Sequence, residues 1–365
     1  FMCDSEKRQS PHEAGVFGMG SRSFFHITDV LQVLSGPMLS LLDPDDILET
    51  GHFGEQTDIT KADLLKNYPD EAAPFMGVFG CDMKSAFRGS IIRASLRTEE
   101  GAKRCTFMPQ AFDLSRAKKI FREFEEVLRN GEVALFLTCV RSVELWQWED
   151  GAKEPALIAR TKLGVSSGHR LPQPISGAAE VKTFLMQFNS FAELEASLRA
   201  TDTKPPHICD IVDMETTVKS GSQVSTRRWL RYGFFSQDPK ILHLVTKCCC
   251  VPLTALALPL GEDSTFDGCL FASLPLPLPT RLPVHVNAHF RLHDNRRAIW
   301  RMSPDLDGEH KLWAEWNEWI LTVMVPDVYS KALELLSGVP DVVADYGHSV
   351  WPRDGEIIKE FTRIL

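Results

Sequence analysis

Hydrophobic residues recur along this chain with two different periods. Alternation of apolar and polar residues is typical of strands, and it predicts strands over residues 77–79, 90–96, 133–139, 143–148, 157–162, 207–217, 225–235, 253–260, 268–274 and 282–287. Apolar residues three and four positions apart are typical of one helix face, and they predict helices over residues 114–129, 179–199, 312–322 and 327–336. The two periods together predict an α/β fold, built as an α+β sandwich of two layers.

The first long helix has clear start and stop signals. Asp113 is a candidate N-cap, and Asn130-Gly131 is a typical helix end. The apolar stripes of the first two helices are interpreted as core-packing positions: Phe121, Phe124, Val127 and Leu128 in one, and Phe184, Phe188, Phe191 and Leu194 in the other.

Length and composition are those of a globular protein. The chain has 365 residues, of which 44% are hydrophobic and 24% charged, enough for two domains. The net charge of −9, with no long basic run, argues against nucleic acid as a partner. The most apolar stretch, residues 251–260, is too short and too rich in proline to span a membrane. Because the first residue is Phe and no signal peptide precedes the fold, we expect a segment of a longer chain.

Nine cysteines include no Cys-x-x-Cys pair. Cys248, Cys249 and Cys250 are adjacent, and neighbouring side chains in a strand point to opposite faces, which suits zinc poorly. We interpret the cysteines as reduced, partly buried thiols and expect a cytoplasmic protein. We expect no metal site.

Three histidines in the last third of the chain alternate with apolar residues. His285, His289 and His293 would share one face of a strand with Asn287 and Arg291. We interpret this face as a polar surface or the wall of a cleft.

The proline-rich segment 274–279, Leu-Pro-Leu-Pro-Leu-Pro, allows two interpretations. One is a polyproline ligand for an SH3-type partner. The other, which we favour, is an extended sheet edge or a rigid connector.

The most informative motif is the glycine-rich stretch near the start, Gly-x-x-Gly-x-Gly from Gly15 through Gly18 to Gly20. Glycines at this spacing let backbone N–H groups surround an anion, because no Cβ is in the way. If Ser21 opens a helix, the dipole of that helix favours the same anion. By itself the glycine spacing fits a plain loop at least as well, and the residues that follow it favour a phosphate-binding loop that includes Met19.

This stretch and several later ones resemble the sacsin repeats, which belong to the superfamily of gyrase, heat-shock chaperone, histidine kinase and MutL ATPases. The likeness runs from about residue 15 to about residue 352, and it is thin between about 150 and 250. Besides the lid motif, the similar segments are Ser35-Gly36, Leu42-Asp43-Pro44, residues 73–80, 87–93, 282–287 and 294–300, Trp313-x-x-Trp-Asn317, and Val325-Pro326.

The resemblance implies the C-terminal part of a Bergerat-type ATPase domain over residues 1–105, followed by a chaperone-like middle domain over 106–365. It implies ATP with Mg²⁺ as cofactor and Gly15, Gly18, Met19, Gly20, Ser21 and Ser90 as binding residues. Ser90 stands where the family usually has a Thr that helps to hold the adenine-reading Asp. The family's general-base Glu, Mg²⁺-binding Asn and Asp-x-Gly turn are not found before Gly15, so ATP turnover depends on elements upstream.

A second candidate site follows the 282–287 strand. In heat-shock chaperones an arginine after a similar strand reaches the γ-phosphate, so the resemblance implies this catalytic role for Arg296 or Arg297. The alternative is a charged turn that pairs with Asp294 or with Asp305 and Asp307.

Three functions remain open from the sequence. The first is part of a sacsin-like, ATP-binding chaperone module that acts on client proteins, with co-chaperones as possible partners. The second is a nucleotide-blind protein-interaction scaffold that keeps the chaperone fold. The third, which is least favoured, is another enzyme of the superfamily, such as a kinase or a DNA-repair ATPase.

Overall fold

The computed structural model describes residues 10–12, 22–106, 108–166, 177–218, 224–261 and 266–338. Inter-residue contacts divide the chain into two compact units, and the boundary between them lies between Arg122 and Glu123, inside helix α4 (Leu114–Asn130). The mixed α/β fold that the sequence predicts is confirmed. The correspondence of the units to a nucleotide-binding domain and a middle domain divided at residue 105 stays a prediction.

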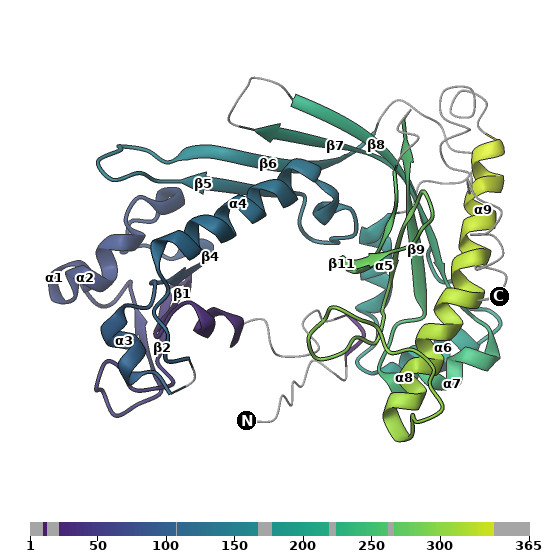
Figure 1. The fold of residues 1–365 in the computed structure, drawn as a ribbon, viewed down its shortest axis with the longest axis horizontal. Helices are drawn as coiled ribbons and strands as arrows, with labels where there is room; N and C mark the ends of the chain where they lie inside the picture. The colour runs from purple at the N-terminus through teal and green to yellow at the C-terminus, as the bar shows by residue number, and fades with distance from the viewer. Residues whose placement is uncertain are drawn as a thin grey trace. The chain divides into compact units, whose positions relative to one another are not determined.

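The first unit contains an antiparallel four-stranded sheet in the order β3-β2-β1-β4 (Figure 1). Gly36, at φ +55°, and Pro37 form the tight turn between the first two strands. A small core with Leu34, Ile59 and Phe75 at its centre covers this sheet. The strands are β1 (Leu31–Gly36), β2 (Met38–Leu42), β3 (Gly54–Asp58) and β4 (Phe87–Ala94).

Short helical segments surround this sheet: η2 (Arg22–His26), α1 (Leu64–Asn67), α2 (Pro69–Ala72), η3 (Ala73–Phe75), η4 (Val78–Gly80) and α3 (Glu99–Arg104). The strand predicted over 77–79 is wrong, because Gly77, Phe79 and Gly80 all have positive φ and form the 3₁₀ turn η4. The strand predicted over 90–96 is confirmed within β4.

The second unit contains an eight-stranded sheet in the order β11-β10-β12-β9-β8-β7-β6-β5. All neighbouring strands are antiparallel except β10 and β12, which are parallel. The strands are β5 (Ser142–Gln147), β6 (Ala156–Val165), β7 (Ile208–Val218), β8 (Val224–Phe235), β9 (Leu253–Leu260), β10 (Cys269–Ala272), β11 (Leu274–Pro279) and β12 (His285–Ala288). The strands predicted over 143–148, 157–162, 207–217, 225–235 and 253–260 are thus confirmed, as are shorter forms of 268–274 and 282–287.

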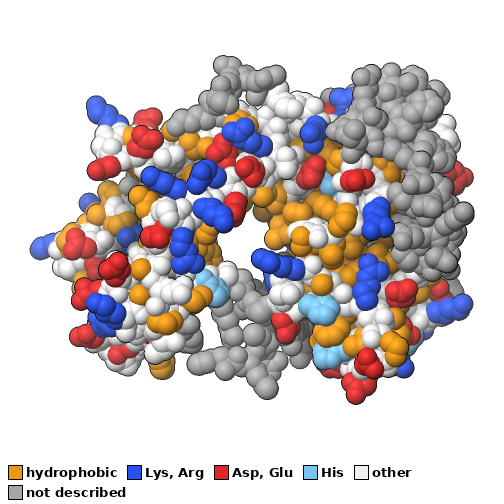
Figure 2. Space-filling view, in the orientation of Figure 1, with side chains coloured by type: hydrophobic (Ala, Val, Ile, Leu, Met, Phe, Trp, Pro, Cys, Tyr) orange, Lys and Arg blue, Asp and Glu red, His pale blue; other side chains and the backbone are white. Residues whose placement is uncertain are grey.

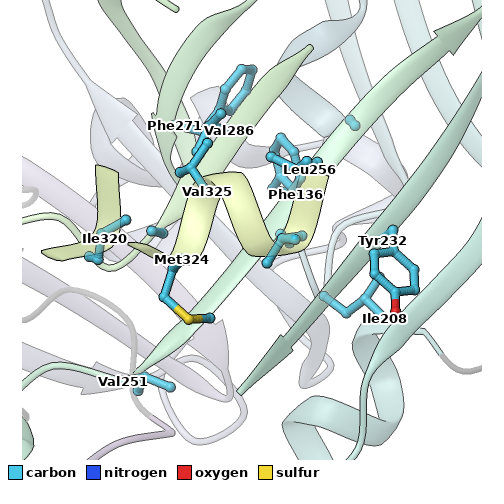
Figure 3. Packing of buried hydrophobic residues seen from close by; sticks show 14 of the residues in the cluster. Phe136, Ile208, Tyr232, Val251, Leu256, Phe271, Val286, Ile320, Met324 and Val325 are labelled. Carbon is cyan, nitrogen blue, oxygen red and sulfur yellow. The ribbon is translucent and has the colours of Figure 1, made fainter. Parts of the chain in front are cut away.

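Helices pack against this sheet around one large core, in which Phe136, Leu256, Phe271 and Val286 lie close to Val325 (Figure 3). The helices are α5 (Ala178–Leu185), α6 (Phe191–Arg199), α7 (Pro239–Cys248), α8 (Gly308–Trp319) and α9 (Val325–Ser337). A π-helical turn, η6 (Ile320–Met324), joins the last two into one continuous rod. The helices predicted over 114–129, 312–322 and 327–336 are therefore confirmed.

Two further predicted elements, both in the second unit, differ from the structure. The helix expected over 179–199 is two helices, because Ser190 caps a new start by accepting from the Glu193 N–H at 3.3 Å. The strand expected over 133–139 is wrong. This segment instead begins with the 3₁₀ turn η5 (Glu132–Ala134), which follows Gly131 at φ +74°. The apolar run there, including Leu135 and Phe136, is buried without pairing in the sheet.

We expected the apolar stripe of α4 to pack in a core, and this expectation is wrong for most of its residues. Leu128 is buried, but Phe121, Phe124 and Val127 are 38–39% exposed. Three of the four expected core residues are therefore only partly covered.

The cysteine run is also arranged differently from a strand. Cys248 ends α7, Cys249 adopts the left-handed cap at φ 46°, and Cys250 is buried. Burial raises the pKa of the Cys248 and Cys250 thiols to about 12, which keeps them protonated and unreactive. The cysteines within the described ranges are free thiols.

The proline-rich segment is the edge strand β11, as the favoured interpretation expects. The strand interpretation of the histidines holds only for His285. That residue is 1% exposed and stacks on Trp229 at 5.2 Å, so it belongs to an aromatic core and not to a polar surface.

Candidate functional site

The candidate phosphate loop, Gly15, Gly18, Met19, Gly20 and Ser21, lies outside the described residues. The structure does describe the segment that follows it directly, residues 22–30, and the strand that carries Ser90. These two parts belong to the first unit.

One buried arginine holds the segment that follows the glycine motif. Arg97 lies just past β4, and its guanidinium forms an ion pair with Asp29. It also donates to the carbonyl oxygens of Phe25 at 2.6 Å, Thr28 at 3.0 Å and Met108 at 3.1 Å. The backbone N–H of Arg97 donates to Ile27 O at 2.8 Å. One side chain therefore fixes both η2 and the loop after α3 to the end of the sheet.

The sequence marks Arg97 only through the resemblance, in which Arg93-Ala-Ser-Leu-Arg97 keeps both arginines of the family motif. It does not indicate the partner, because Asp29 is 68 residues away. Arg93, on β4, donates to Gln32 on the neighbouring β1. Arg93 thus links two strands of the sheet, whereas Arg97 binds the sheet to its surroundings.

Ser90 lies on β4 opposite Ser35 of β1, and the two hydroxyl oxygens are 2.8 Å apart. Both side chains are at the solvent-exposed end of the strand pair, next to the Gly36-Pro37 turn. A hydroxyl both donates and accepts, so this pair keeps hydrogen-bonding capacity for a further polar group. The arrangement suits the role that the resemblance implies for Ser90, which is to help to hold the adenine-reading Asp.

The second candidate site is a hairpin that follows β12. Leu292 pairs with Ile299, His293 N donates to Ala298 O at 2.9 Å, and Trp300 N donates to Arg291 O at 3.0 Å. At the tip, Arg296 N donates to His293 O at 2.8 Å, and Arg296 itself has φ 54°. The chain therefore turns sharply at Arg296.

The hairpin is fixed to α8 by a buried asparagine. Asn317 is fully buried, accepts from Arg291 N at 2.8 Å, and donates to Arg291 O at 2.8 Å and Trp300 O at 2.9 Å. Trp300 stacks between His293 at 4.1 Å and His310 at 4.2 Å, measured between ring centroids. A rigid base therefore supports the exposed tip.

Arg296 and Arg297 lie at this tip, and both are exposed, as are Asp294 and Asn295. Arg297 N donates to Asn295 Oδ1 at 2.9 Å, which stabilises the turn. The tip thus presents two guanidinium groups on a braced turn, an arrangement that can bind anions. A catalytic role for either arginine stays a prediction.

A buried histidine next to this hairpin makes the stability of the second unit depend on pH. His289 Nδ1 accepts from Val251 N at 3.1 Å, and Trp316 Nε1 donates to His289 O at 3.0 Å. Burial, and secondly the Arg291 guanidinium, lowers the pKa of His289 to about 4. The folded chain therefore keeps this imidazole neutral.

We expect the free energy of unfolding to fall by about 2 kcal/mol between pH 7 and pH 5 through His289 alone. The unfolded chain takes up this proton below its ordinary pKa of 6.5, whereas the folded chain does so only near pH 4. Urea unfolding at both pH values measures the loss, and the variant His289→Gln, which keeps an acceptor, should reduce it. An equal loss in wild type and variant would contradict the assignment.

No cluster of His, Cys, Asp or Glu within the described parts of the chain could hold a metal ion. In the same parts, no helix has the length and apolar character to cross a bilayer.

Comparison with known proteins agrees with the motifs. The Sacsin domain family matches residues 2–160, a range that contains the glycine motif, β1 to β4 and α4. The chain is 29% identical to sacsin of Homo sapiens over 391 aligned residues, covering 99% of this chain. It spans 8% of the length of that relative. The domain match, the alignment along nearly the whole chain and the order of the motifs together support the assignment of this chain as a sacsin-repeat protein.

Proposed function

We propose that this chain is part of a sacsin-like chaperone module that binds ATP with Mg²⁺ and assists the folding or quality control of client proteins. The observation that carries the proposal is the Sacsin domain match across the glycine motif, together with the way the following segment is anchored. A phosphate loop needs a fixed exit to present its N–H groups to an anion. Arg97 and Asp29 supply a buried anchor for that exit.

The alternative function is a protein-interaction scaffold that has kept the fold and does not bind nucleotide. The exposed apolar stripe of α4 favours a role in protein contacts under either function. The two differ in whether ATP changes the interaction with a client.

Light scattering of a heat-denatured model client tests the proposal, with the natural full-length polypeptide present and Mg-ATP added or omitted. Under the proposed function, ATP changes the extent of client aggregation in the wild type and not in Gly20→Ala, whose added Cβ obstructs the phosphate loop. Equal protection with and without ATP would favour the scaffold.

Ser90→Ala should weaken Mg-ATP binding about three- to tenfold, because it removes one hydrogen bond that a water or carboxylate shares with the nucleotide. Because Ser90 is exposed, the free energy of unfolding should stay within about 0.5 kcal/mol of wild type. Titration calorimetry measures the affinity. The control Ser40→Ala removes a hydroxyl of β2, which accepts from Gln56 Nε2 at 3.1 Å, and should leave the affinity unchanged.

Arg297→Gln and Arg296→Asn should each lower ATP turnover by about 10²–10³ while changing ATP affinity little, if these groups stabilise the charge of the transition state. Asparagine is chosen at position 296 because it tolerates the left-handed backbone there. Single-turnover hydrolysis in the natural full-length polypeptide is the measurement. Wild-type rates in both variants would leave the turn without a catalytic role.

A further inference from the structure

A thiol and an amine are in direct contact in the second unit, and the proposed function uses neither of them. Cys139 is exposed and lies in the segment between η5 and β5, and Lys182 lies on α5. Lys182 Nζ donates to Cys139 Sγ at 3.0 Å, although the two residues are 43 positions apart in the sequence. The fold therefore places a nucleophilic sulfur beside a nitrogen that can react with the oxidised form of that sulfur.

Packing fixes the main chain on both sides of this contact. Val181, which precedes Lys182, is buried in the large core of the second unit. Leu135 and Phe136, a few residues before Cys139, are buried in the same core, where Figure 3 shows Phe136. The contact therefore joins two segments that the core already holds, so a bond between them requires little further ordering of the chain.

The surroundings of Cys139 favour its thiolate. The Thr138 hydroxyl, 3.5 Å from the sulfur, and then the Lys182 ammonium lower the pKa of the Cys139 thiol below its usual range. Burial has the opposite effect on Cys209 and Cys269, whose pKa it raises to about 11. Because peroxides oxidise the thiolate, Cys139 is the most readily oxidised of these three thiols.

Lys182 makes this contact in place of an ion pair. Basic and acidic side chains are interspersed over the face of the molecule in Figure 2, and lysines such as Lys61 and Lys331 each pair with an aspartate. Within the described ranges, Lys182 Nζ has one hydrogen bond, to the Cys139 sulfur, and no carboxylate partner. The ammonium is therefore directed at the sulfur and is not held by a carboxylate.

We propose that Cys139 and Lys182 form a reversible covalent sulfenamide bridge when they meet hydrogen peroxide. In the first step the thiolate sulfur attacks one peroxide oxygen, and the O–O bond breaks. Cys139 becomes a sulfenic acid, the peroxide is reduced, and the departing hydroxide takes a proton from the Lys182 ammonium and leaves as water. This proton transfer leaves Lys182 as the neutral amine that the second step needs.

In the second step the amine nitrogen attacks the sulfenic sulfur, and the S–O bond breaks. An S–N bond forms, and the hydroxyl group leaves with one amine proton as a second water. A reducing thiol reverses the bridge: it attacks the sulfur, the S–N bond breaks, and the amine takes up the proton of that thiol. A second thiol then releases Cys139 from the resulting mixed disulfide.

The bridge fastens the segment after η5 to α5. That segment supports the buried ion pair of Arg231 and Asp210, because the Leu135 carbonyl oxygen accepts from Arg231 Nη1 at 2.8 Å. A cross-link between residues 43 positions apart also restricts the unfolded chain. Mild oxidation therefore stabilises the second unit, and a reducing thiol returns it to its starting stability.

Mass spectrometry of the 365-residue chain, after treatment with hydrogen peroxide and digestion, tests the proposal. We expect the peptides that carry Cys139 and Lys182 to be joined, with a mass two hydrogens below the sum of the separate peptides, and to separate on adding dithiothreitol. The bridged chain should unfold about 5–10 °C above the equally treated Cys139→Ser variant.

Lys182→Arg separates the bridge from simple oxidation, because a guanidinium keeps the positive charge but stays protonated and offers no free amine. This variant should lose the joined peptides entirely, while its Cys139 sulfenic acid stays available to a dione reagent that labels sulfenic acids. The matched control Lys240→Arg changes an exposed lysine of α7 and should form the bridge as the wild type does. Separate peptides in the oxidised wild type, joined peptides in Lys182→Arg, or an unfolding midpoint that the bridge does not raise would overturn the proposal.

Discussion

Replacing Arg97 by methionine is expected to destabilise the first unit by about 3–5 kcal/mol. The guanidinium is buried and makes an ion pair with Asp29, besides its bonds to three backbone carbonyls. Methionine fills similar space but leaves the carboxylate and these carbonyls without a donor. An unpaired charge in a buried position is among the most costly single changes a protein can undergo.

Hydrogen exchange of the β1 and β4 amides measures this loss, because it reports the first unit separately from the second. Arg88→Met is the matched control: Arg88 lies on the same strand but is exposed, and we expect a change within about 0.5 kcal/mol. Adding Asp29→Leu to Arg97→Met should recover part of the stability, because it removes the orphaned carboxylate. Wild-type exchange rates in Arg97→Met would show that Arg97 is not the anchor.

Replacing Asn317 by leucine is expected to destabilise the second unit by about 3 kcal/mol. Leucine has a similar size, but the Arg291 N–H and the Arg291 and Trp300 carbonyls lose their partner. These groups lie at the base of the hairpin that carries Arg296 and Arg297. The tip should therefore lose its fixed position as well as stability.

Urea unfolding gives the loss for Asn317→Leu, and hydrogen exchange at His293 and Trp300 reports the hairpin. Asn295→Ala serves as the control: it removes an exposed asparagine from the tip, whose Oδ1 accepts from Arg297 N, and should cost about 1 kcal/mol or less. If the His293 and Trp300 amides of the Asn317→Leu variant exchanged hydrogen as slowly as those of the wild type, the contact with α8 would not be what supports the hairpin.

Periodicity in the sequence is enough to predict most of the larger sheet and the longest helices. Strands such as β7 and β8 are long runs rich in β-branched and aromatic residues, which favour strands, and α8 and α9 repeat their apolar residues every three or four positions. Helix α7 is absent from the prediction, although Asp238 followed by Pro239 is a typical helix start. The Ser190-x-x-Glu193 sequence likewise marks the start of α6.

Other features could not be predicted, because they depend on distant contacts. The apolar run at Leu135 and Phe136 reads equally well as a buried strand or as a buried irregular segment. The roles of Arg97 and Asn317 need partners that only the fold brings near. The partial exposure of the apolar residues of α4 could not be predicted either, because their spacing along the sequence is the same whether or not a core covers them.

Calorimetric titration of Mg-ATP into the natural full-length polypeptide tests the central claim most directly. We predict binding in the micromolar to millimolar range that is lost in both Gly18→Ala and Gly20→Ala, with the fold of each variant intact by circular dichroism. Binding of the same strength in the wild type and both glycine variants would show that the glycine motif is not the phosphate-binding loop. A folded wild type that binds no nucleotide would contradict the ATP-binding module and leave the interaction scaffold in its place.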